Sequence, residues 1–149
     1  MMGLVQRVDS CTVKVEGETV SSIGRGLLVL LGVHREDTEE DLDLLVRKCV
    51  GLRVFSDDEG KMNRSIADIG GSFLVVSQFT LFGDVRRGLR PYFGDAALPD
   101  KANAYYERFM GELVKTGLPV RGGVFGAHMH LEIHNDGPVT IPIDTRGMK

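Results

Sequence analysis

Two apolar runs constrain the fold of this chain more than any other feature of its sequence. Leu27–Val33 is almost uninterrupted aliphatic sequence, and Phe73–Phe82 is a second run of aliphatic and aromatic residues. Apolar runs of this length, bounded by turn residues, are typical of buried strands. Both are therefore predicted to be central strands of a sheet.

Further strands are predicted toward both ends of the chain. Residues 4–15 and 19–23 carry apolar positions on either side of the turn Glu16-Gly17, which indicates a β-hairpin. Near the other end, apolar and polar residues alternate over 129–133, and 139–143 is expected to form a last strand. A turn is predicted between these two strands.

Two helices are predicted between the strands. Thr38 is a good N-cap that forms a capping-box pattern with Asp41, and Gly51 is placed to end the first helix. The second helix is expected to start near Pro99, a residue that favours the first turn, and to end at Gly117.

Many strands with two inserted helices, without strict alternation, predict an α+β fold. We expect a single domain over residues 1–149, in which a compact barrel-like sheet of mixed or antiparallel strands carries two main helices. A chain of 149 residues buries enough surface for a core without covalent or metal staples. Cys11 and Cys49 show no metal-like spacing and are predicted to be buried free thiols.

The charge balance excludes one class of protein. With 18 Lys+Arg against 21 Asp+Glu the net charge is −3, which excludes a globally basic nucleic-acid coat but permits a local basic patch. No apolar run approaches the length of about 18 residues that a membrane span needs. The N-terminus also lacks the pattern of a signal peptide, so we expect a soluble cytoplasmic protein without a membrane partner.

A glycine- and proline-containing loop over 84–91 concentrates positive charge. Arg86, Arg87 and Arg90 lie within five residues of one another in an acidic chain. Arginine side chains bind phosphates bidentately, so the loop is a candidate contact for an anion or an RNA backbone. The alternative is an ordinary solvated surface loop.

Four polar residues alternate with apolar ones near the C-terminus. His128, His130, Glu132 and His134 are expected to share one face of a strand. Histidines two residues apart can hold a metal ion, but no second element supplies further ligands, so a polar, solvent-facing strand surface is favoured over a metal site.

The second apolar run contains the polar stretch Ser77-Gln78-Phe79-Thr80. Strand alternation would place Ser77 and Phe79 on one face and Gln78 and Thr80 on the other. The hydroxyl groups could act as a nucleophile or as hydrogen-bond donors, or merely cap a strand end. No histidine lies nearby in the sequence, so a conventional Ser–His triad is not favoured.

Seven short segments match the sequence motifs of one protein family, in the same order along the chain. The two most specific are SQFTL at 77–81, within the matched run 75–81, and NDGPVT at 135–140. Together the seven resemble the D-aminoacyl-tRNA deacylases of the bacterial–eukaryotic type, and the resemblance spans the whole chain. The remaining segments are 6–8, 26–32, 60–63, 90–91 and 125–129.

This resemblance implies a barrel-like β fold flanked by helices and assembled as a homodimer. It implies hydrolysis of the ester between a D-amino acid and the 3′-terminal adenosine of tRNA, with rejection of L-aminoacyl-tRNA. The expected partner is therefore the acceptor end of D-aminoacyl-tRNA, and not DNA. Neither a metal nor an organic cofactor is implied.

The resemblance also implies catalytic roles for the SQFTL stretch. Ser77, Gln78 and Phe79 would line the pocket, and Thr80 matches the position proposed as nucleophile in the family. In an alternative mechanism, the terminal 2′-hydroxyl of the RNA assists a water molecule and the protein mainly positions the ester. Backbone N–H groups near Phe79 and Thr80 could then serve as oriented donors.

Substrate-binding roles are implied for residues of other matched segments. Gly137-Pro138 would be cis and would enter the pocket of the partner subunit, with Arg7 as its support and Met129 in the pocket wall. Selection of the D-form would then act by exclusion of L side chains. Glycine has no side chain to exclude, so glycyl-tRNA is an expected substrate as well. Independently of the resemblance, the charge density of the loop makes Arg86, Arg87 and Arg90 the expected contacts to the tRNA backbone.

Two other functions are compatible with parts of the sequence. A non-catalytic RNA-binding module would use the loop Arg86–Arg90, and a metal-dependent hydrolase would use His128, His130 and His134. The joint presence of SQFTL and NDGPVT favours the deacylase over both.

Overall fold

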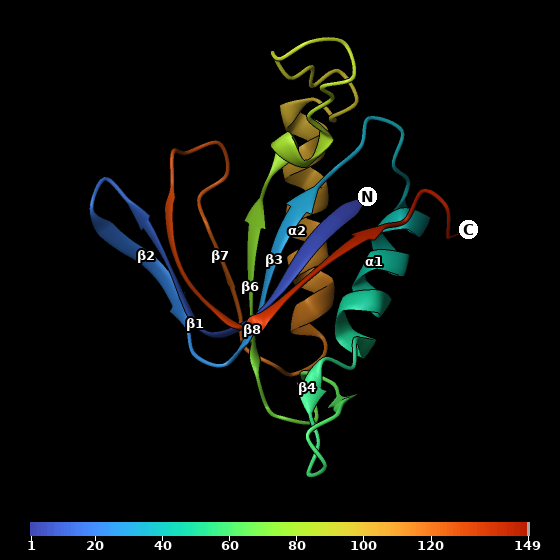
Figure 1. Ribbon diagram of the computed structural model, residues 1–149. Coiled ribbons are helices and arrows are strands. Elements are labelled where there is room, and N and C mark those ends of the chain that lie inside the picture. Colours follow the sequence, from blue (N-terminus) through green and yellow to red (C-terminus); the bar gives the residue numbers. More distant parts are fainter. Residues whose placement is uncertain (149) are drawn as a thin grey trace.

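A computed structural model describes residues 1–148 of the chain (Figure 1). Its sheet is organised around β1 (Met2–Val15), the longest strand of the N-terminal half. β1 pairs antiparallel with β2 (Glu18–Ile23), β3 (Gly26–Gly32) and β8 (His130–Asp144). The β1–β2 turn places Glu16 at φ 50° and Gly17 at φ 79°. This confirms the predicted hairpin.

The centre of the sheet is parallel. β6 (Ser72–Ser77) runs parallel to β3, and β7 (Val120–Gly122) runs parallel to β6. Leu27, Leu28, Phe73 and Leu74 are completely buried, which confirms the first apolar run as a central strand and the second as far as Ser77. The strand order β2-β1-β3-β6-β7, with β8 also on β1, makes the sheet mixed.

The sheet curls until its edges approach each other. β2 lies against β6 and β7, and the Ser21 hydroxyl donates a hydrogen bond to the Gly122 carbonyl oxygen at 2.6 Å. Together with the two helices this confirms the predicted α+β class and its barrel-like sheet.

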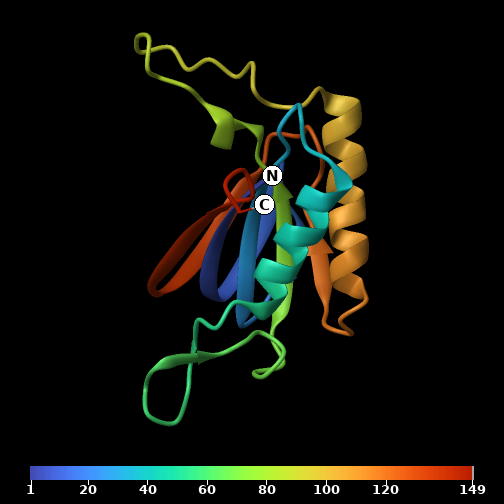
Figure 2. The ribbon, with the colours of Figure 1, turned by 90° about the vertical axis from the view of Figure 1, so that its right-hand side faces the viewer.

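Both predicted helices are present and cover the same face of the sheet (Figure 2). α1 (Glu39–Gly51) begins with the predicted capping box of Thr38 and Asp41. α2 (Pro99–Val114) starts with its proline in the first turn, and Gly117 adopts a positive φ of 83° just beyond its end. Their buried residues, among them Leu45 and Phe109, join the main core with β3 and β6.

A small ribbon extends the lower end of the molecule in Figure 1. It consists of β4 (Phe55–Ser56) and β5 (Met62–Arg64), which pair antiparallel.

The C-terminal region differs from the sequence-based expectation. Instead of two strands joined by a turn, a single bent strand, β8, follows β1 along its whole length. Val8 pairs with Asn135 and Gln6 with Thr140, so the four residues 136–139 bulge opposite Arg7. The predicted turn residues form this bulge, because β1 continues past it and pairs with both halves of β8.

Both cysteines are buried and free, as predicted. Burial raises the pKa of Cys11 to about 11 and that of Cys49 to about 12, so both remain protonated thiols at neutral pH. Among the described residues, no helix has the length and apolar character needed to cross a membrane.

The close approach of β3 and β6 leads to a stability prediction. A Cβ atom on Gly26 would lie 1.9 Å from the Ser72 carbonyl oxygen, so Gly26→Ala must push the two strands apart. We expect the free energy of unfolding to fall by about 3 kcal/mol, as for a severe overpacking change. Urea denaturation measures this loss.

Gly24→Ala is the matched control, because a Cβ there meets nothing within 4 Å. Its unfolding free energy should stay within about 0.5 kcal/mol of the wild-type value. Equal denaturation midpoints for the two variants would contradict the packing argument.

Candidate active site

A cavity of about 610 Å³ opens where β6 ends. Ser77, Gln78 and Phe79 line it from the β6 end, which places three of the four predicted catalytic residues at one site. The remaining walls come from residues 93–102 and 125–131. A cavity of this volume accommodates a small organic group.

The backbone at the cavity does not continue as the predicted strand. The last pair of the β3–β6 ladder is Leu31 with Ser77, after which the Gln78 N–H donates to the Leu31 carbonyl at 2.7 Å. The chain then turns into the short 3₁₀ helix η1 (Phe79–Phe82). The expected alternation of faces over 77–80 is therefore wrong, because β3 ends at Gly32 and provides no further ladder.

Thr80 lies beside the cavity rather than in its lining. Its side chain belongs to an exposed residue of η1, and the Gln78 side-chain amide donates a hydrogen bond to its hydroxyl. Gln78 is itself a lining residue. The Gln78 and Thr80 side chains are thus hydrogen-bonded to each other, but only Gln78 lines the cavity.

Aromatic and apolar side chains form the cavity walls. Phe79 packs edge-to-face against Phe93, with ring centroids 5.1 Å apart, yet remains 54% exposed at the mouth. Met129 lies in the wall as predicted, and its sulfur accepts a hydrogen bond from the Val124 N–H at 3.4 Å. Ser77, Gln78 and His128 supply the polar side chains in this mainly apolar lining.

The Gly137-Pro138 segment forms a second cluster, held by Arg7. The Arg7 Nε donates to the Asp136 carbonyl oxygen at 3.2 Å and lies 3.0 Å from its carboxylate. A terminal nitrogen of Arg7 donates to the Val54 carbonyl at 2.7 Å. The Gly137–Pro138 peptide bond is cis, and both residues are exposed.

Asn135 fixes the same bulge from the other side. Its amide nitrogen donates to the carbonyl oxygens of Arg7 and Val139 at 3.0 and 3.1 Å. The bulge is therefore held at both ends while its tip faces outward.

Within one protomer the cavity and the bulge are far apart. Arg7 pairs with Leu27 on β3, whereas Ser77 pairs with Leu31. These two β3 positions are four residues apart, which corresponds to about 13 Å along the sheet. Neither Arg7 nor Gly137-Pro138 lines the cavity, so a single protomer does not bring all predicted site residues together.

The arginine loop extends from the cavity mouth and stands away from the sheet (Figure 2). Arg86 is 84% exposed and pairs with Asp84 at 2.6 Å, and hydrogen bonds from Arg86 lower the pKa of Asp84 to about 2. Arg87 and Arg90 are exposed and have no carboxylate within salt-bridge distance among residues 1–148. Phe93, a cavity residue, follows directly after this loop, so the base of the loop adjoins the cavity.

Comparison with known proteins identifies the family. A family model described as D-Tyr-tRNA(Tyr) deacylase matches residues 4–144. The chain belongs to this family. A D-aminoacyl-tRNA deacylase from Thermotoga petrophila is 57% identical over 97% of each chain, and one from Anaeromyxobacter dehalogenans is 54% identical over 98% of each.

Two solved structures share the fold of this deacylase family member. One, named c-Myc DNA Unwinding Element Binding Protein, superposes with a TM-score of 0.91 at 44% identity, covering 97% of this chain and 98% of its own. A probable eukaryotic D-amino acid tRNA deacylase superposes with a TM-score of 0.77 at 22% identity, covering 95% and 98%. The second likeness shows the fold alone.

The histidines near the C-terminus of this deacylase-family chain are not gathered with other potential metal ligands among residues 1–148. No cluster of three potential ligands occurs in the part of the chain that the structure describes. Glu132 instead pairs with Lys14 at 2.8 Å, and His130 and His134 are exposed. His128 lies outside β8 and lines the cavity, so the predicted shared strand face is wrong for this residue.

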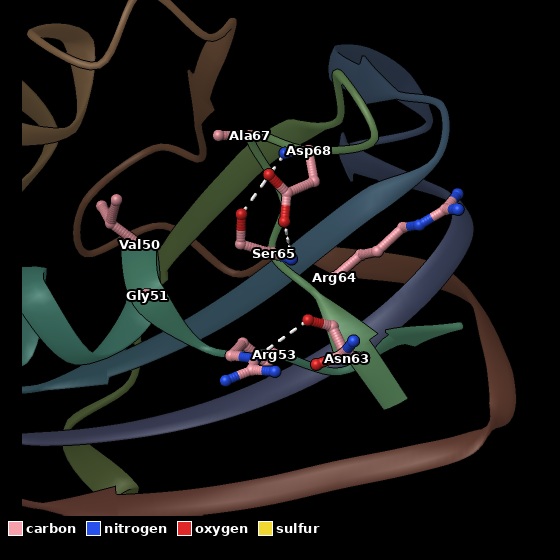
Figure 3. A pocket seen from close by; sticks show the side chains of 8 residues that line it. All are labelled: Val50, Gly51, Arg53, Asn63, Arg64, Ser65, Ala67 and Asp68. Atoms are coloured by element: carbon pink, nitrogen blue, oxygen red, sulfur yellow. Dashed lines mark hydrogen bonds between the residues drawn. The ribbon is translucent and has the colours of Figure 1, made fainter. Parts of the chain in front are cut away.

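A second, more open cleft of about 760 Å³ lies between the end of α1 and β5 (Figure 3). Arg53 and Arg64 line it together with Asp68, whose pKa is lowered by hydrogen bonds from Ser65 and by both arginines. Arg64 also pairs with Asp58 at 2.8 Å. Because these charges balance, and because no predicted site residue lines the cleft, we assign no ligand to it.

Sequence reasoning did not single out several cavity residues. Phe93 and Leu98 flank the loop that leads to α2, and nothing in their local sequence indicates that they face the end of β6. The stretch 125–129 did carry a signal, since it is one of the segments that resemble the family. Contacts between such distant segments depend on the curl of the sheet.

Proposed function

We propose that this chain hydrolyses the ester between a D-amino acid and the 3′-terminal adenosine of tRNA, releasing the free D-amino acid and the tRNA. The observation that carries the proposal is the SQFTL stretch at an apolar cavity of about 610 Å³ in a member of this family. Such an activity is chiral proofreading of translation, and we place it in the cytoplasm.

The cavity chemistry suits an ester that is already activated. Positioning and a few oriented donors can then supply much of the catalysis. The first N–H groups of η1 have no acceptor within that helix, so those near Phe79 and Thr80 are candidate donors to the developing oxyanion. A water molecule, assisted by the terminal 2′-hydroxyl of the RNA, adds to the carbonyl, and the 3′-oxygen leaves with a proton.

Selection of the D-form requires a rigid element at the cavity. We propose that the Gly137-Pro138 bulge of one subunit enters the cavity of its partner in a homodimer. Two observations support this: the bulge lies far from the cavity of its own protomer, and Arg7 and Asn135 hold it in place. Fixed backbone carbonyls in that position exclude an L side chain by collision.

The arginine loop is the proposed contact with the tRNA backbone. Arg87 and Arg90 are exposed on the loop whose base adjoins the cavity, and the surface pair of Arg86 with Asp84 is weak enough for a phosphate to replace. Because only the 3′ end enters the cavity, phosphates further along the acceptor strand can lie against this loop.

Deacylation time courses on D-alanyl-, glycyl- and L-alanyl-tRNA test the function and its selectivity. We expect hydrolysis of the D-alanyl and glycyl esters and none of the L-alanyl ester at the same enzyme concentration. Glycine cannot collide with an excluding backbone, and a missing methyl group changes binding only modestly.

D-tyrosyl-tRNA should also be hydrolysed, because a broad D-specific site makes few contacts to the side chain. Stability of every D-ester would contradict the deacylase itself. Glycyl-tRNA as stable as the L-alanyl ester would instead contradict selection by exclusion alone.

Thr80→Ala is expected to keep substantial turnover. Thr80 lies outside the cavity lining, and no described contact joins its hydroxyl to a base. Loss of a true serine-type nucleophile costs a factor on the order of 10⁶ in turnover. Single-turnover rates of Thr80→Ala and of the control Thr80→Ser distinguish the two roles, and a trapped acyl-enzyme on the wild type would overturn this expectation.

The proposed homodimer predicts a particle of twice the chain mass. Light scattering at the enzyme concentration used for activity measures this directly. We expect activity and dimer to disappear together on dilution, since each cavity is completed by the other subunit. A fully active monomer would rule out the cross-subunit role of Gly137-Pro138.

Arg86→Gln combined with Arg87→Gln is expected to weaken tRNA binding. Each phosphate that the loop no longer neutralises should reduce the slope of log affinity against log salt by about 1. Hydrolysis of a D-aminoacyl-adenosine ester, which has no such phosphates, should be unchanged. The same salt slope in the variant and the wild type would remove the loop from the tRNA interface.

A further inference from the structure

Tyr92 presents an unexplained exposed ring between the arginine loop and the cavity. Tyr92 is 63% exposed and does not line the cavity. The next residue, Phe93, does line the cavity and packs on Phe79. Tyr92 thus lies immediately outside the mouth, on the same short segment as Arg90.

The backbone of Tyr92 is fixed although its ring is exposed. Its N–H donates to the Asp84 carbonyl at 2.9 Å, and its carbonyl accepts from the Asp84 N–H at 2.9 Å. This reciprocal pair closes the base of the loop that carries the three arginines. The backbone position from which the Tyr92 ring extends is therefore fixed, unlike that of a residue at a free loop tip.

Gly94 fixes the direction of the ring. A Cβ atom on Gly94 would lie 1.9 Å from the Tyr92 hydroxyl oxygen and 2.0 Å from the ring carbon that bears it. The ring folds over this glycine and occupies the space that any larger residue would fill. Part of the ring surface is thereby covered, while the rest faces solvent.

We propose that Tyr92 is a stacking platform for an unpaired base of the tRNA 3′ end, just outside the cavity that holds the terminal adenosine. Aromatic rings interleaved with arginines bind single-stranded nucleic acid, because the rings stack on bases while the arginines neutralise phosphates. Exposed Arg87 and Arg90 lie on the loop that Tyr92 closes. This inference rests on the proposed function.

Kinetics on two substrates test the assignment. Tyr92→Ala is expected to raise KM for D-aminoacyl-tRNA about 5- to 30-fold, the range expected when one base–ring stack is removed, with kcat unchanged. Tyr92→Phe should restore the wild-type KM. Neither variant should affect hydrolysis of a D-aminoacyl-adenosine ester, which lacks the base to be stacked.

Gly94→Ala provides a variant that moves the ring without removing it. The colliding atoms are the far end of the Tyr92 side chain, which can swing away, so the fold should persist. We expect KM for the tRNA substrate to rise as in Tyr92→Ala, with an unchanged salt slope, since stacking releases no counterions. Thermal melting confirms that each variant is folded.

Fluorescence gives a direct readout, because the chain contains no tryptophan. Tyr92→Trp should show quenching when a tRNA acceptor-stem hairpin with a single-stranded 3′ end is added. Val114→Trp, at a position 58% exposed at the end of α2, is the control and should show none.

The outcomes separate this inference from the proposed function. Wild-type protein that hydrolyses neither substrate contradicts the deacylase. Active wild type with an unchanged tRNA KM in Tyr92→Ala overturns only the stacking role. An equal rise in KM for the adenosine ester also overturns it, since the effect would then lie inside the cavity.

Discussion

β1 pairs with three other strands, and the positions of both candidate site clusters depend on this pairing. Its first half lies between β3 and β8, and its second half between β2 and β8. The antiparallel β1–β3 pair brings Arg7 opposite Leu27 and fixes the end of the sheet at which the Gly137-Pro138 bulge lies. The parallel β3–β6 pair ends at the opposite end of the sheet, where Ser77 lines the cavity.

This separation is the main consequence of the architecture for function. The apolar cavity with its polar Ser77 and Gln78 can hold a small acyl group, but within one protomer it has no contact with Gly137-Pro138. The bulge is held by Arg7 and Asn135, yet Gly137 and Pro138 at its tip are exposed. Dimerisation in the proposed function joins a pocket for the ester to an element that excludes the wrong hand.

Local sequence signals predicted the elements whose boundaries are decided locally. The capping box at Thr38 and the proline at Pro99 set helix starts through contacts within one turn, and both were predicted correctly. The prediction that residues 78–82 continue the second central strand was wrong, and the chain turns into a 3₁₀ helix there instead. Their conformation depends on where the neighbouring strand β3 ends, which local sequence does not show. The last two predicted strands proved to be one for the same reason, since β1 spans both of them.

The sequence by itself determined the α+β class, the two buried strands and both helices, and its resemblance to the family made the stretch 77–79 a candidate for the site. Periodicity, capping and turn chemistry act over a few residues, so they can be recognised without a structure. Only the tertiary structure decided that Phe93 and Leu98 share a cavity with Ser77, that Thr80 lies outside its lining, and that the bulge held by Arg7 lies at the far end of the sheet from the cavity. These relations depend on register and on the curl of the sheet, which are set by pairing between segments up to about 130 residues apart.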